Sequence, residues 1–348
     1  MKNIFSAAVL ALSAAMAVSL AGQSPAGTAT AGGRTPWGHP DLQGIWNVST
    51  LTPLERPQNA GDKLSLTKEE AETVARTERD RVQNRAQPSN PNRPAPVVGG
   101  NVGTYNDFWV DRGSSSFMID GQFRSSIIVD PVDGRVPAMT DAARKRNAGT
   151  RGTAVLPTSD ALETAPAQGM GAYDDIELRP FAERCLLAFG SSSGPPTLPN
   201  YGYNNLKQIV QTPNAVMILI EMVHDARIIR LNSQHPPAHI RHWMGDSIGR
   251  WEGDTLVVET TNFTNKTRFR GSSENMKVIE RFRRVNQDTI LYRFTIEDPD
   301  TWARSWSGEY PWQASSEQIY EYACHEGNYA MVGIMKGERL LDKERSQK

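Results

Sequence analysis

The hydrophobic and polar positions of the chain change their pattern near residue 203. Beyond it, short runs rich in Val, Ile, Thr, Tyr and Phe alternate with turn residues such as Glu297-Asp-Pro-Asp300, which is typical of β-strands joined by tight turns. The predicted strands are Gln208–Gln211, Ala215–Val223, Ala226–Leu231, Thr255–Thr261, Lys277–Val285, Thr289–Glu297, Gln318–Tyr322 and Tyr329–Met335. This spacing predicts an antiparallel meander that forms a barrel or a sandwich.

The segment before residue 203 contains fewer such runs. A helix is predicted over residues 66–85, because Thr67-Lys-Glu-Glu70 fits a capping box and residues of high helix propensity follow it. The segments Ser116–Met118 and Arg124–Asp130 predict a short hairpin. The expected fold class is therefore all-β, an antiparallel meander barrel with one N-terminal helix.

Two stretches rich in Pro, Gly, Asn and Ala, residues 87–104 and 143–174, interrupt the N-terminal half of the chain. Loops of this length are usually lids, binding loops or disordered inserts. The sequence shows no internal repeat and no Gly-rich nucleotide-binding loop. We therefore expect one β-barrel domain over residues 36–340, with the helix and the two loops as additions to it.

The first 21 residues have the pattern of a secretory signal peptide. Lys2 supplies a positive start, Ile4–Leu20 is a run of apolar and small residues, and Ser19-Leu20-Ala21 fits a cleavage site. An uncleaved membrane anchor is the alternative, but no charged flank follows Ala21. Residues 22–35 have little to bury and are expected to be disordered. These features predict a periplasmic or extracellular protein.

Export would place the two cysteines, Cys185 and Cys324, in an oxidising compartment. Two cysteines in a secreted chain are most simply explained by one disulfide. Two buried thiols are an alternative, because sequence alone does not place their Cβ atoms within bonding distance. A catalytic cysteine paired with His325 is a third interpretation, although adjacent strand residues point to opposite faces.

Composition narrows the class of partner. The 348 residues contain 38 Lys and Arg against 39 Asp and Glu, so the chain lacks the basic footprint of a general nucleic-acid-binding protein. A mean hydropathy of -0.51 argues against stable membrane insertion after the leader is removed. No Gly-x-Ser-x-Gly elbow is present. No cofactor is expected, and the oligomeric state is left open.

The residues Gly44-Ile45-Trp46, at the expected first strand, carry a first resemblance. They resemble the Gly-x-Trp signature that opens the first strand of lipocalins and related calycin barrels. The resemblance implies a closed barrel that holds one small ligand in its mouth.

A second resemblance covers roughly residues 36–335. The block Gly249-Arg-Trp-Glu-Gly-Asp-Thr-Leu-Val-Val-Glu-Thr-Thr-Asn-Phe263 is similar to a stretch of a family of exported bacterial proteins. Tyr203-Asn-Asn205, Glu221-Met-Val-His-Asp-Ala-Arg227 and Tyr322-Ala-Cys-His-Glu-Gly-Asn328 are similar to that family too. The resemblance implies a single fold unit and export. It implies no particular reaction, so its motif residues are taken only as candidates.

Ionisable residues are set into several of the predicted apolar strands. Glu280 and Glu321 each alternate with apolar neighbours and are therefore expected to face the barrel interior. Paired carboxylates with a histidine suit general acid–base catalysis, since a partly desolvated carboxylate has a raised pKa. The candidate catalytic residues are Glu221, His224, Glu280, Glu321 and His325.

Candidate substrate-binding residues lie at strand ends or in predicted loops. Trp302 and Trp306 fall in a loop-like stretch, where exposed rings could stack on a sugar or an aromatic ligand. The full set is Asp225, Arg227, Tyr203, Trp251, Trp302 and Trp306. A structural role competes with this interpretation, because Arg227 could simply pair with Glu221 or Asp225 and so hold strands together.

Three histidines, His235, His239 and His242, have spacings that would bring them together on a helix. Pro236 and Pro237 lie between the first two and break any helix there. A solvated loop is therefore expected, and no metal site is predicted.

Together these patterns predict an exported protein that acts on a small molecule. The leading hypothesis is a cofactor-independent lyase, isomerase or hydrolase that uses carboxylate and histidine acid–base chemistry on an amphipathic or aromatic substrate. One alternative is a non-catalytic, lipocalin-like ligand-binding protein. The other is a glycan-active enzyme, which would need two carboxyl groups at glycosidase separations beside an aromatic cleft.

Overall fold

The computed structural model describes residues 33–88, 92, 94, 110–148, 173–179, 181–187, 194–200, 202–266 and 269–347. The predicted signal peptide over residues 1–21 lies outside the described residues. The predicted lead-in, 22–35, and the predicted loops, 87–104 and 143–174, lie mostly outside them. Within the described chain, no helix combines the length and the apolar character that a membrane span requires.

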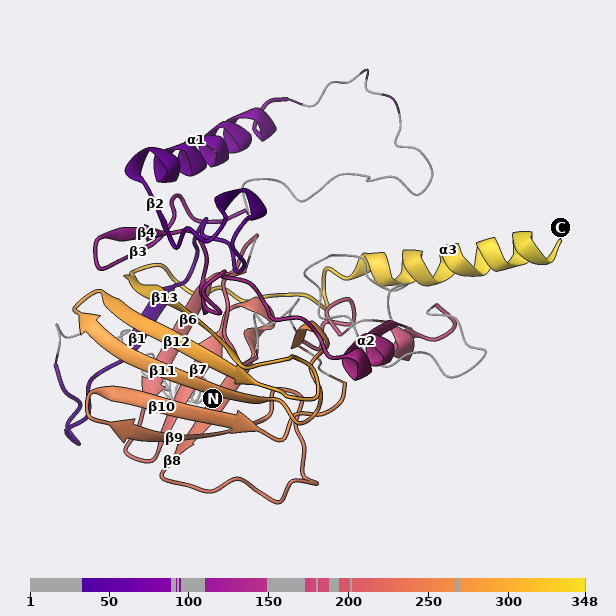
Figure 1. The fold of residues 1–348 in the computed structure, drawn as a ribbon. Helices are drawn as coiled ribbons and strands as arrows, with labels where there is room; N and C mark the ends of the chain where they lie inside the picture. Colours follow the sequence, from indigo (N-terminus) through magenta and orange to yellow (C-terminus); the bar gives the residue numbers. More distant parts are fainter. Residues whose placement is uncertain are drawn as a thin grey trace, which may run out of the picture.

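Within the described residues, nine strands close into a barrel (Figure 1). Their order around the ring is β1-β6-β7-β8-β9-β10-β11-β12-β13, and β1 closes it by pairing with both β6 and β13. The strands are β1 (Gly44–Asn47), β6 (Leu206–Gln211), β7 (Ala215–Ile220), β8 (Ala226–Leu231), β9 (Asp246–Glu252), β10 (Thr255–Thr261), β11 (Lys277–Asn286), β12 (Thr289–Glu297) and β13 (Trp306–Ser315).

Six of the predicted strands are confirmed, and β8, β10 and β12 match residue for residue. The prediction of a purely antiparallel meander is wrong at one place, because β8 and β9 pair in parallel. Residues 232–245 connect these two strands, and a connection of a dozen or more residues is long enough for the crossover that a parallel pair needs.

The last two predicted strands are wrong. Gln318–Tyr322 forms no regular element, and Tyr329–Met335 is the start of the helix α3 (Tyr329–Ser346). Met331 and Met335 are the buried residues of α3, so the apolar positions follow the helical spacing of four rather than the strand spacing of two.

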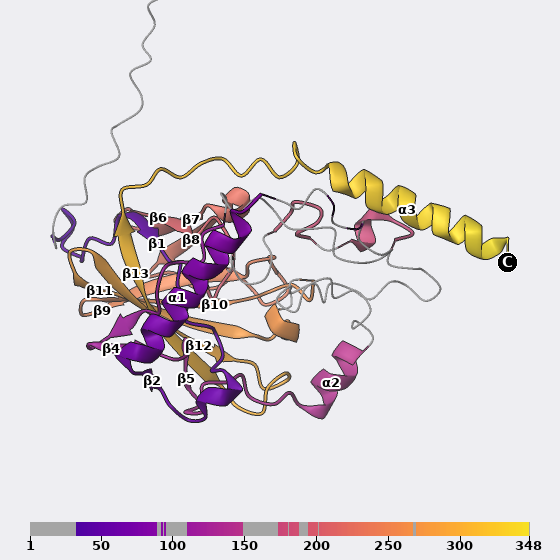
Figure 2. The same cartoon turned by 90° about the horizontal axis from the view of Figure 1, so that it is seen from above.

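Smaller elements lie outside the barrel, and α3 projects away from it (Figure 2). Helix α1 (Lys68–Arg85) begins at the predicted capping box, in which Thr67 and Glu70 each accept a hydrogen bond from the other's backbone N–H. The described chain contains two further α-helices, α3 and α2 (Asp141–Ala148), so the prediction of a single helix was incomplete.

A small sheet contains β2 (Ser65–Leu66), β4 (Gln122–Arg124) and β3 (Met118–Ile119), while β5 (Ile128–Asp130) pairs with β13. Short 3-10 turns are η1 (Gln58–Ala60), η4 (Ile176–Leu178), η6 (Met222–His224) and η7 (Phe269–Gly271).

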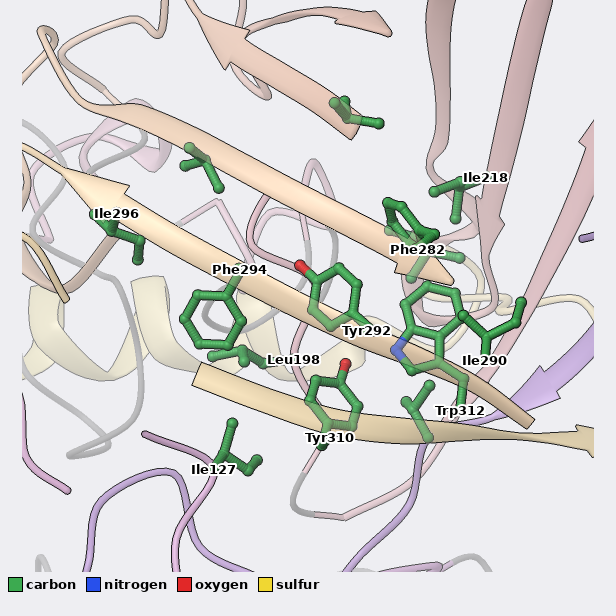
Figure 3. Close-up of a cluster of buried hydrophobic side chains, with 14 of the residues drawn as sticks. Ile127, Leu198, Ile218, Phe282, Ile290, Tyr292, Phe294, Ile296, Tyr310 and Trp312 are labelled. Carbon is green, nitrogen blue, oxygen red and sulfur yellow. The ribbon is translucent and has the colours of Figure 1, made fainter. Parts of the chain in front are cut away.

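Large side chains fill much of the barrel interior. The rings of Tyr292, Phe294, Tyr310 and Trp312 gather over β12 and β13 (Figure 3), and each is fully buried. The expectation of exposed Trp302 and Trp306 rings is wrong. Trp306 begins β13, and the two rings pack edge to face with centroids 5.7 Å apart in the core, where they are 2% and 0% exposed.

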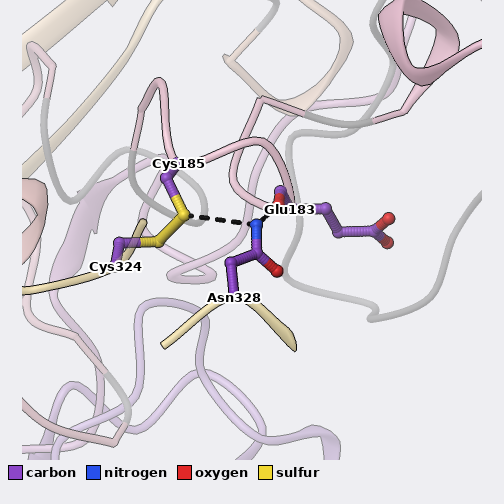
Figure 4. Close-up of a disulfide and its surroundings, with 4 residues drawn as sticks. All are labelled: Glu183, Cys185, Cys324 and Asn328. Carbon is purple, nitrogen blue, oxygen red and sulfur yellow. Dashed lines mark hydrogen bonds between the residues drawn. A yellow bond between two sulfur atoms is a disulfide. The ribbon is translucent and has the colours of Figure 1, made fainter. Parts of the chain in front are cut away.

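The predicted disulfide between Cys185 and Cys324 is present, with Cα atoms 5.7 Å apart (Figure 4). Asn328 supports it, because its Nδ2 donates to the backbone oxygen of Glu183 at 2.7 Å. The bond fastens the end of residues 316–328, an irregular segment that runs outside the barrel from β13 to α3 (Figure 2). We call this segment the strap.

Close packing around Gly308 of β13 gives a test of this core. A Cβ at Gly308 would lie 2.5 Å from Cζ of Phe294 and 3.1 Å from Cγ2 of Ile127. We expect Gly308→Ala to lower the free energy of unfolding by about 1–3 kcal/mol, because the core would be overpacked. Urea unfolding followed by tryptophan fluorescence measures this.

Gly337→Ala is the matched control, since Gly337 lies in α3 and a Cβ added there would meet no atom within 4 Å. Alanine is favoured over glycine inside a helix by about 1 kcal/mol. Equal stability of the Gly308→Ala variant and the parent protein would contradict the described packing of Phe294.

Candidate functional site

Arg227 of β8 and Glu280 of β11 form an ion pair inside the barrel. Nη1 and Nη2 of Arg227 donate to the two carboxylate oxygens of Glu280 at 2.5 and 3.0 Å, and the side chains are 4% and 0% exposed. The two strands are not neighbours in the ring, so the pair crosses the interior. Burial acts to lower the pKa of Arg227, but the Glu280 carboxylate outweighs it and raises this pKa.

A hydrogen-bonded network extends this pair to the residues that cover the barrel. Tyr292 donates its hydroxyl proton to Glu280 Oε1 at 2.8 Å and accepts the backbone N–H of Thr197 at 3.0 Å. Tyr310 donates to the backbone oxygen of Thr197 at 2.7 Å. Thr197 is itself fully buried. The network therefore holds the backbone of Thr197 and links β8, β11, β12 and β13.

These contacts define what Glu280 can do. The prediction that it shares an inward face with Val278 and Phe282 is confirmed, since all three are 0% exposed. Its oxygens accept two N–H groups from Arg227 and one O–H from Tyr292. The predicted pairing of Arg227 with Glu221 or Asp225 is replaced by this pairing with Glu280. A carboxylate held in this way suits the positioning of strands better than the transfer of a proton.

Lys207 of β6 is another buried ionisable residue, and the sequence analysis did not select it. It alternates with Ile209 and Gln211 on the inner face, is 0% exposed, and is opposite Trp46 of β1 and Ile220 of β7 in the strand register. Its Nζ has no hydrogen-bond partner among the described residues. Burial lowers the pKa of Lys207 to about 7, against the opposing effect of the Glu221 and Asp225 carboxylates.

Glu221 directly follows β7 and lies at the same end of the barrel. Its side chain is 6% exposed, and its Oε2 accepts the backbone N–H of Leu206 at 3.2 Å. The backbone N–H of Tyr320 in the strap and the Asn204 side chain also hydrogen-bond to this carboxyl group. Burial nevertheless raises the pKa of Glu221, so this carboxyl group holds a proton more tightly than a solvated one.

The turn between β7 and β8 is strained beside these two residues. Val223 has a φ of 57° and is 4% exposed, although a β-branched residue rarely adopts this left-handed conformation. Such strain often accompanies functional sites, where the surrounding structure holds it in place. Asp225 ends the turn, and the side chain of His224 lies outside the described residues. We call Lys207, Glu221 and Asp225, together with this turn, the barrel-end site.

The strap residues of the predicted catalytic set lie elsewhere. Glu321 and His325 are exposed, so the expectation that they face the barrel interior is wrong. The reason is that their segment forms no strand, which removes the alternation on which the expectation depended. The structure therefore brings Glu221 next to Lys207, but it does not bring Glu321 or His325 into that group.

Two predicted aromatic binding residues are partly buried. Tyr203 stacks on Tyr322 of the strap, with ring centroids 6.5 Å apart, and it directly precedes Asn204, a partner of Glu221. Trp251 of β9 instead stacks on His39, with centroids 4.8 Å apart. Tyr203 is thus adjacent to the barrel-end site along the chain.

The histidine-rich segment shows no metal centre. Nδ1 of His235 lies 2.6 Å from Asp246, and its Nε2 lies 3.5 Å from Glu259. Within the described ranges, no group of three or more His, Cys, Asp or Glu side chains could hold a metal ion.

A surface cavity of about 680 Å³ lies between α2 and the turn after β12. Its lining includes Arg146, Ser273 and Asp300, each of which already has a protein partner. These three side chains therefore already take part in the protein's own contacts.

Lys207 was missed because the predicted strand began two residues too late, at Gln208 instead of Leu206. Extending the alternation of Ile209 and Gln211 backwards by one step places Lys207 on the inner face. A lysine at such a position is the signal that could have identified it. The role of Thr197 has no comparable signal, because it depends on contacts with strands about a hundred residues further along.

Comparisons of this chain with protein-family models, with curated proteins and with solved structures found no match. The function of the barrel-end site is therefore argued from its own geometry.

The ion pair gives a test of the network. Glu280→Gln leaves the Arg227 cation buried without its counter-charge, so we expect the free energy of unfolding to fall by about 3–5 kcal/mol in urea titrations. Glu259→Gln is the control, because Glu259 is 32% exposed and its ion pair with Lys277 is at the surface. Such surface pairs contribute about 0–1 kcal/mol.

A second variant covers the case in which Glu280→Gln does not fold. Combining Arg227→Met with Glu280→Leu removes both charges, and buried pairs replaced by apolar residues often keep or gain stability. We expect this double variant to be more stable than Glu280→Gln. Equal losses from Glu280→Gln and Glu259→Gln would contradict the buried pair.

The lowered pKa of Lys207 predicts a dependence of stability on pH. Between pH 7 and 10.5 the unfolded chain binds a proton that the folded chain lacks, so the free energy of unfolding rises with pH across this window. Lys207→Met removes this contribution and is the more stable protein near neutral pH. Its advantage should shrink by about 1.4 kcal/mol per pH unit as the pH rises.

Urea titrations at several pH values between 7 and 10 measure this difference. Lys336→Met is the control, since Lys336 is exposed on α3. A constant difference between Lys207→Met and the parent protein across the window would show that Lys207 keeps an ordinary pKa.

Proposed function

We propose that this protein is a small-molecule enzyme that performs cofactor-independent acid–base chemistry at the barrel-end site. The observation that carries the proposal is the Lys207 amine, which is fully buried, lacks a hydrogen-bond partner among the described residues and is electrostatically coupled to Glu221 and Asp225. A structural lysine would normally be paired when buried this deeply. The reaction class is a lyase, isomerase or hydrolase, and the place of action is the periplasm or the cell exterior.

The two principal groups have complementary roles. With its pKa near 7, Lys207 has a large neutral fraction at neutral pH and accepts a proton from the substrate as general base. The raised pKa of Glu221 suits it to donate a proton as general acid. Asp225 favours positive charge on Lys207 when the proton arrives. The proposed pair thus replaces the carboxylate–histidine pair expected from the sequence.

An amphipathic or aromatic substrate fits the surroundings of this pair. Trp46 and Ile220 flank Lys207 in the strand register, and Tyr203 and Tyr322 stack beside the Glu221 contacts. The strap contacts this site, because the backbone of Tyr320 interacts with the Glu221 carboxyl group, and we propose that it moves aside when a substrate binds. The strap has no regular secondary structure before α3, which makes such a displacement inexpensive compared with opening the sheet.

A calycin-like barrel is the finer fold proposal. It is supported by the closed ring and by Gly44-Ile45-Trp46 at β1, whose tryptophan is 1% exposed. The parallel pairing of β8 with β9 departs from a simple up-and-down barrel.

The closed ring also favours the second candidate function, a non-catalytic binding protein for a small ligand. The glycan-active alternative has less support, because Arg227 and Tyr292 already engage the Glu280 carboxylate.

Turnover by the mature chain, residues 22–348 with its disulfide formed, tests the proposal. The protein is incubated with a mixed extract of phenolics, lipids and glycans, and masses are followed over time against a heat-inactivated sample. We expect a parent mass to fall and a product mass to rise. Lys207→Met and Glu221→Gln should each slow this conversion by about 10²–10⁴-fold, the usual contribution of a general acid or base.

Lys336→Met serves as the control and should leave the conversion unchanged, because Lys336 is exposed on α3. Stoichiometric loss of a parent mass without a product would favour the binding protein instead. Conversion that survives in both site variants would overturn the assignment to Lys207 and Glu221.

A further inference from the structure

We infer that the Lys207 amine is a nucleophile that forms an imine with its substrate, so the substrates of the barrel-end site are small, mainly apolar aldehydes or ketones. This inference rests on the proposed function and deepens it. It changes Lys207 from a group that only moves protons into one that bonds to the substrate.

The first support is that the Lys207 amine is not paired with a carboxylate. Within the described chain, the buried Nζ of Lys207 has no hydrogen-bond partner, and no carboxylate forms an ion pair with it. The two carboxylates whose charges act on Lys207 are those of Glu221 and Asp225. Neither forms an ion pair with it in the described structure, and Glu221 instead accepts the backbone N–H groups of Leu206 and Tyr320. A close carboxylate would hold the amine as an ammonium ion, which has no lone pair to attack a carbonyl carbon.

The second support is the apolar wall around the amine. Trp46, Ile209 and Ile220 are its neighbours on the same or adjacent strands, and each is at most 2% exposed. Such surroundings disfavour an ammonium ion and tolerate a neutral imine. They also exclude the water that would hydrolyse an imine. Desolvation of a lysine in an apolar pocket is one of the ways in which proteins activate an amine nucleophile.

The residues of the site complete the chemistry without an external redox partner. The lone pair of Lys207 Nζ forms a bond to the carbonyl carbon, and the carbonyl oxygen takes up a proton from Glu221. Nζ then returns a proton to the Glu221 carboxylate, which leaves a neutral carbinolamine. Glu221 protonates the hydroxyl group, which departs as water while the nitrogen lone pair forms the C=N bond. The balance is one amine and one carbonyl compound giving one protonated imine and one water, with the proton supplied by Glu221.

Reductive trapping tests the inference. The folded mature chain is incubated near pH 7 with 3-phenylpropanal and sodium cyanoborohydride, and lysine adducts are located by peptide mass spectrometry. Hydride reduces the imine to a secondary amine, so the labelled peptide gains the mass of the probe less one oxygen atom. A lysine with a pKa near 7 has a neutral fraction about 10³-fold above that of an exposed lysine at this pH, so we expect labelling of Lys207 to exceed that of Lys336 at least tenfold.

Two controls test whether the labelling of Lys207 depends on the folded site and on the proton donor Glu221. Labelling of the parent protein in urea should lose the preference for Lys207, because the unfolded chain gives every lysine an ordinary pKa. Glu221→Gln should slow labelling of Lys207 and leave that of Lys336 unchanged, since the proton donor is gone. Both comparisons are made within one protein, and the urea sample does not depend on a variant that folds.

The outcomes distinguish this inference from the proposed function. Equal labelling of Lys207 and Lys336 in the folded chain overturns the imine, and turnover that still depends on Lys207 then leaves it as a general base. Selective labelling of Lys207 that disappears in urea supports the imine, including when the extract assay finds no turnover. In that case the amine is reactive, and it is the enzymatic proposal that is overturned.

Discussion

A single buried ion pair constrains the interior of this barrel. Arg227 and Glu280 are charges without access to water, so each is stable only while the other stays in place. Because they come from strands on different sides of the ring, the pair fixes the distance between β8 and β11. Through Tyr292 it also holds the backbone of Thr197.

Local patterns were sufficient to predict much of the fold. The alternation of apolar and polar residues predicted β12 residue for residue, and the Thr67–Glu70 capping box predicted the start of α1. The inward direction of Glu280 follows from the same alternation, because a strand has a fixed period of two. The disulfide was predicted from the number of cysteines and the expected compartment. Each of these features depends on neighbouring residues or on a simple count.

The features that were missed depend on distant parts of the chain. The partner of Arg227 lies 53 residues away, and strand alternation does not say which inward charges meet across a barrel. β13 contains Gly308 and Pro311, which usually interrupt strands. Gly308 is required there because Phe294 occupies the space of a Cβ. The strap resembles a strand in composition, but the β13 edge next to it in the chain is already paired with β1.

The order of the strands along the chain has a consequence for how this protein reaches its folded state. The two cysteines enclose β6 to β13 in one covalent loop, whereas β1 lies outside it, near the N-terminus. β1 is synthesised before the rest of the barrel, yet its two neighbours are the first and the last strands of that loop. Pairings between such distant segments form slowly, since much of the chain must be ordered before they are made. Until then β6 and β13 present open edges that invite association with other chains. Closure by the earliest strand is therefore the step that removes both open edges from contact with other chains.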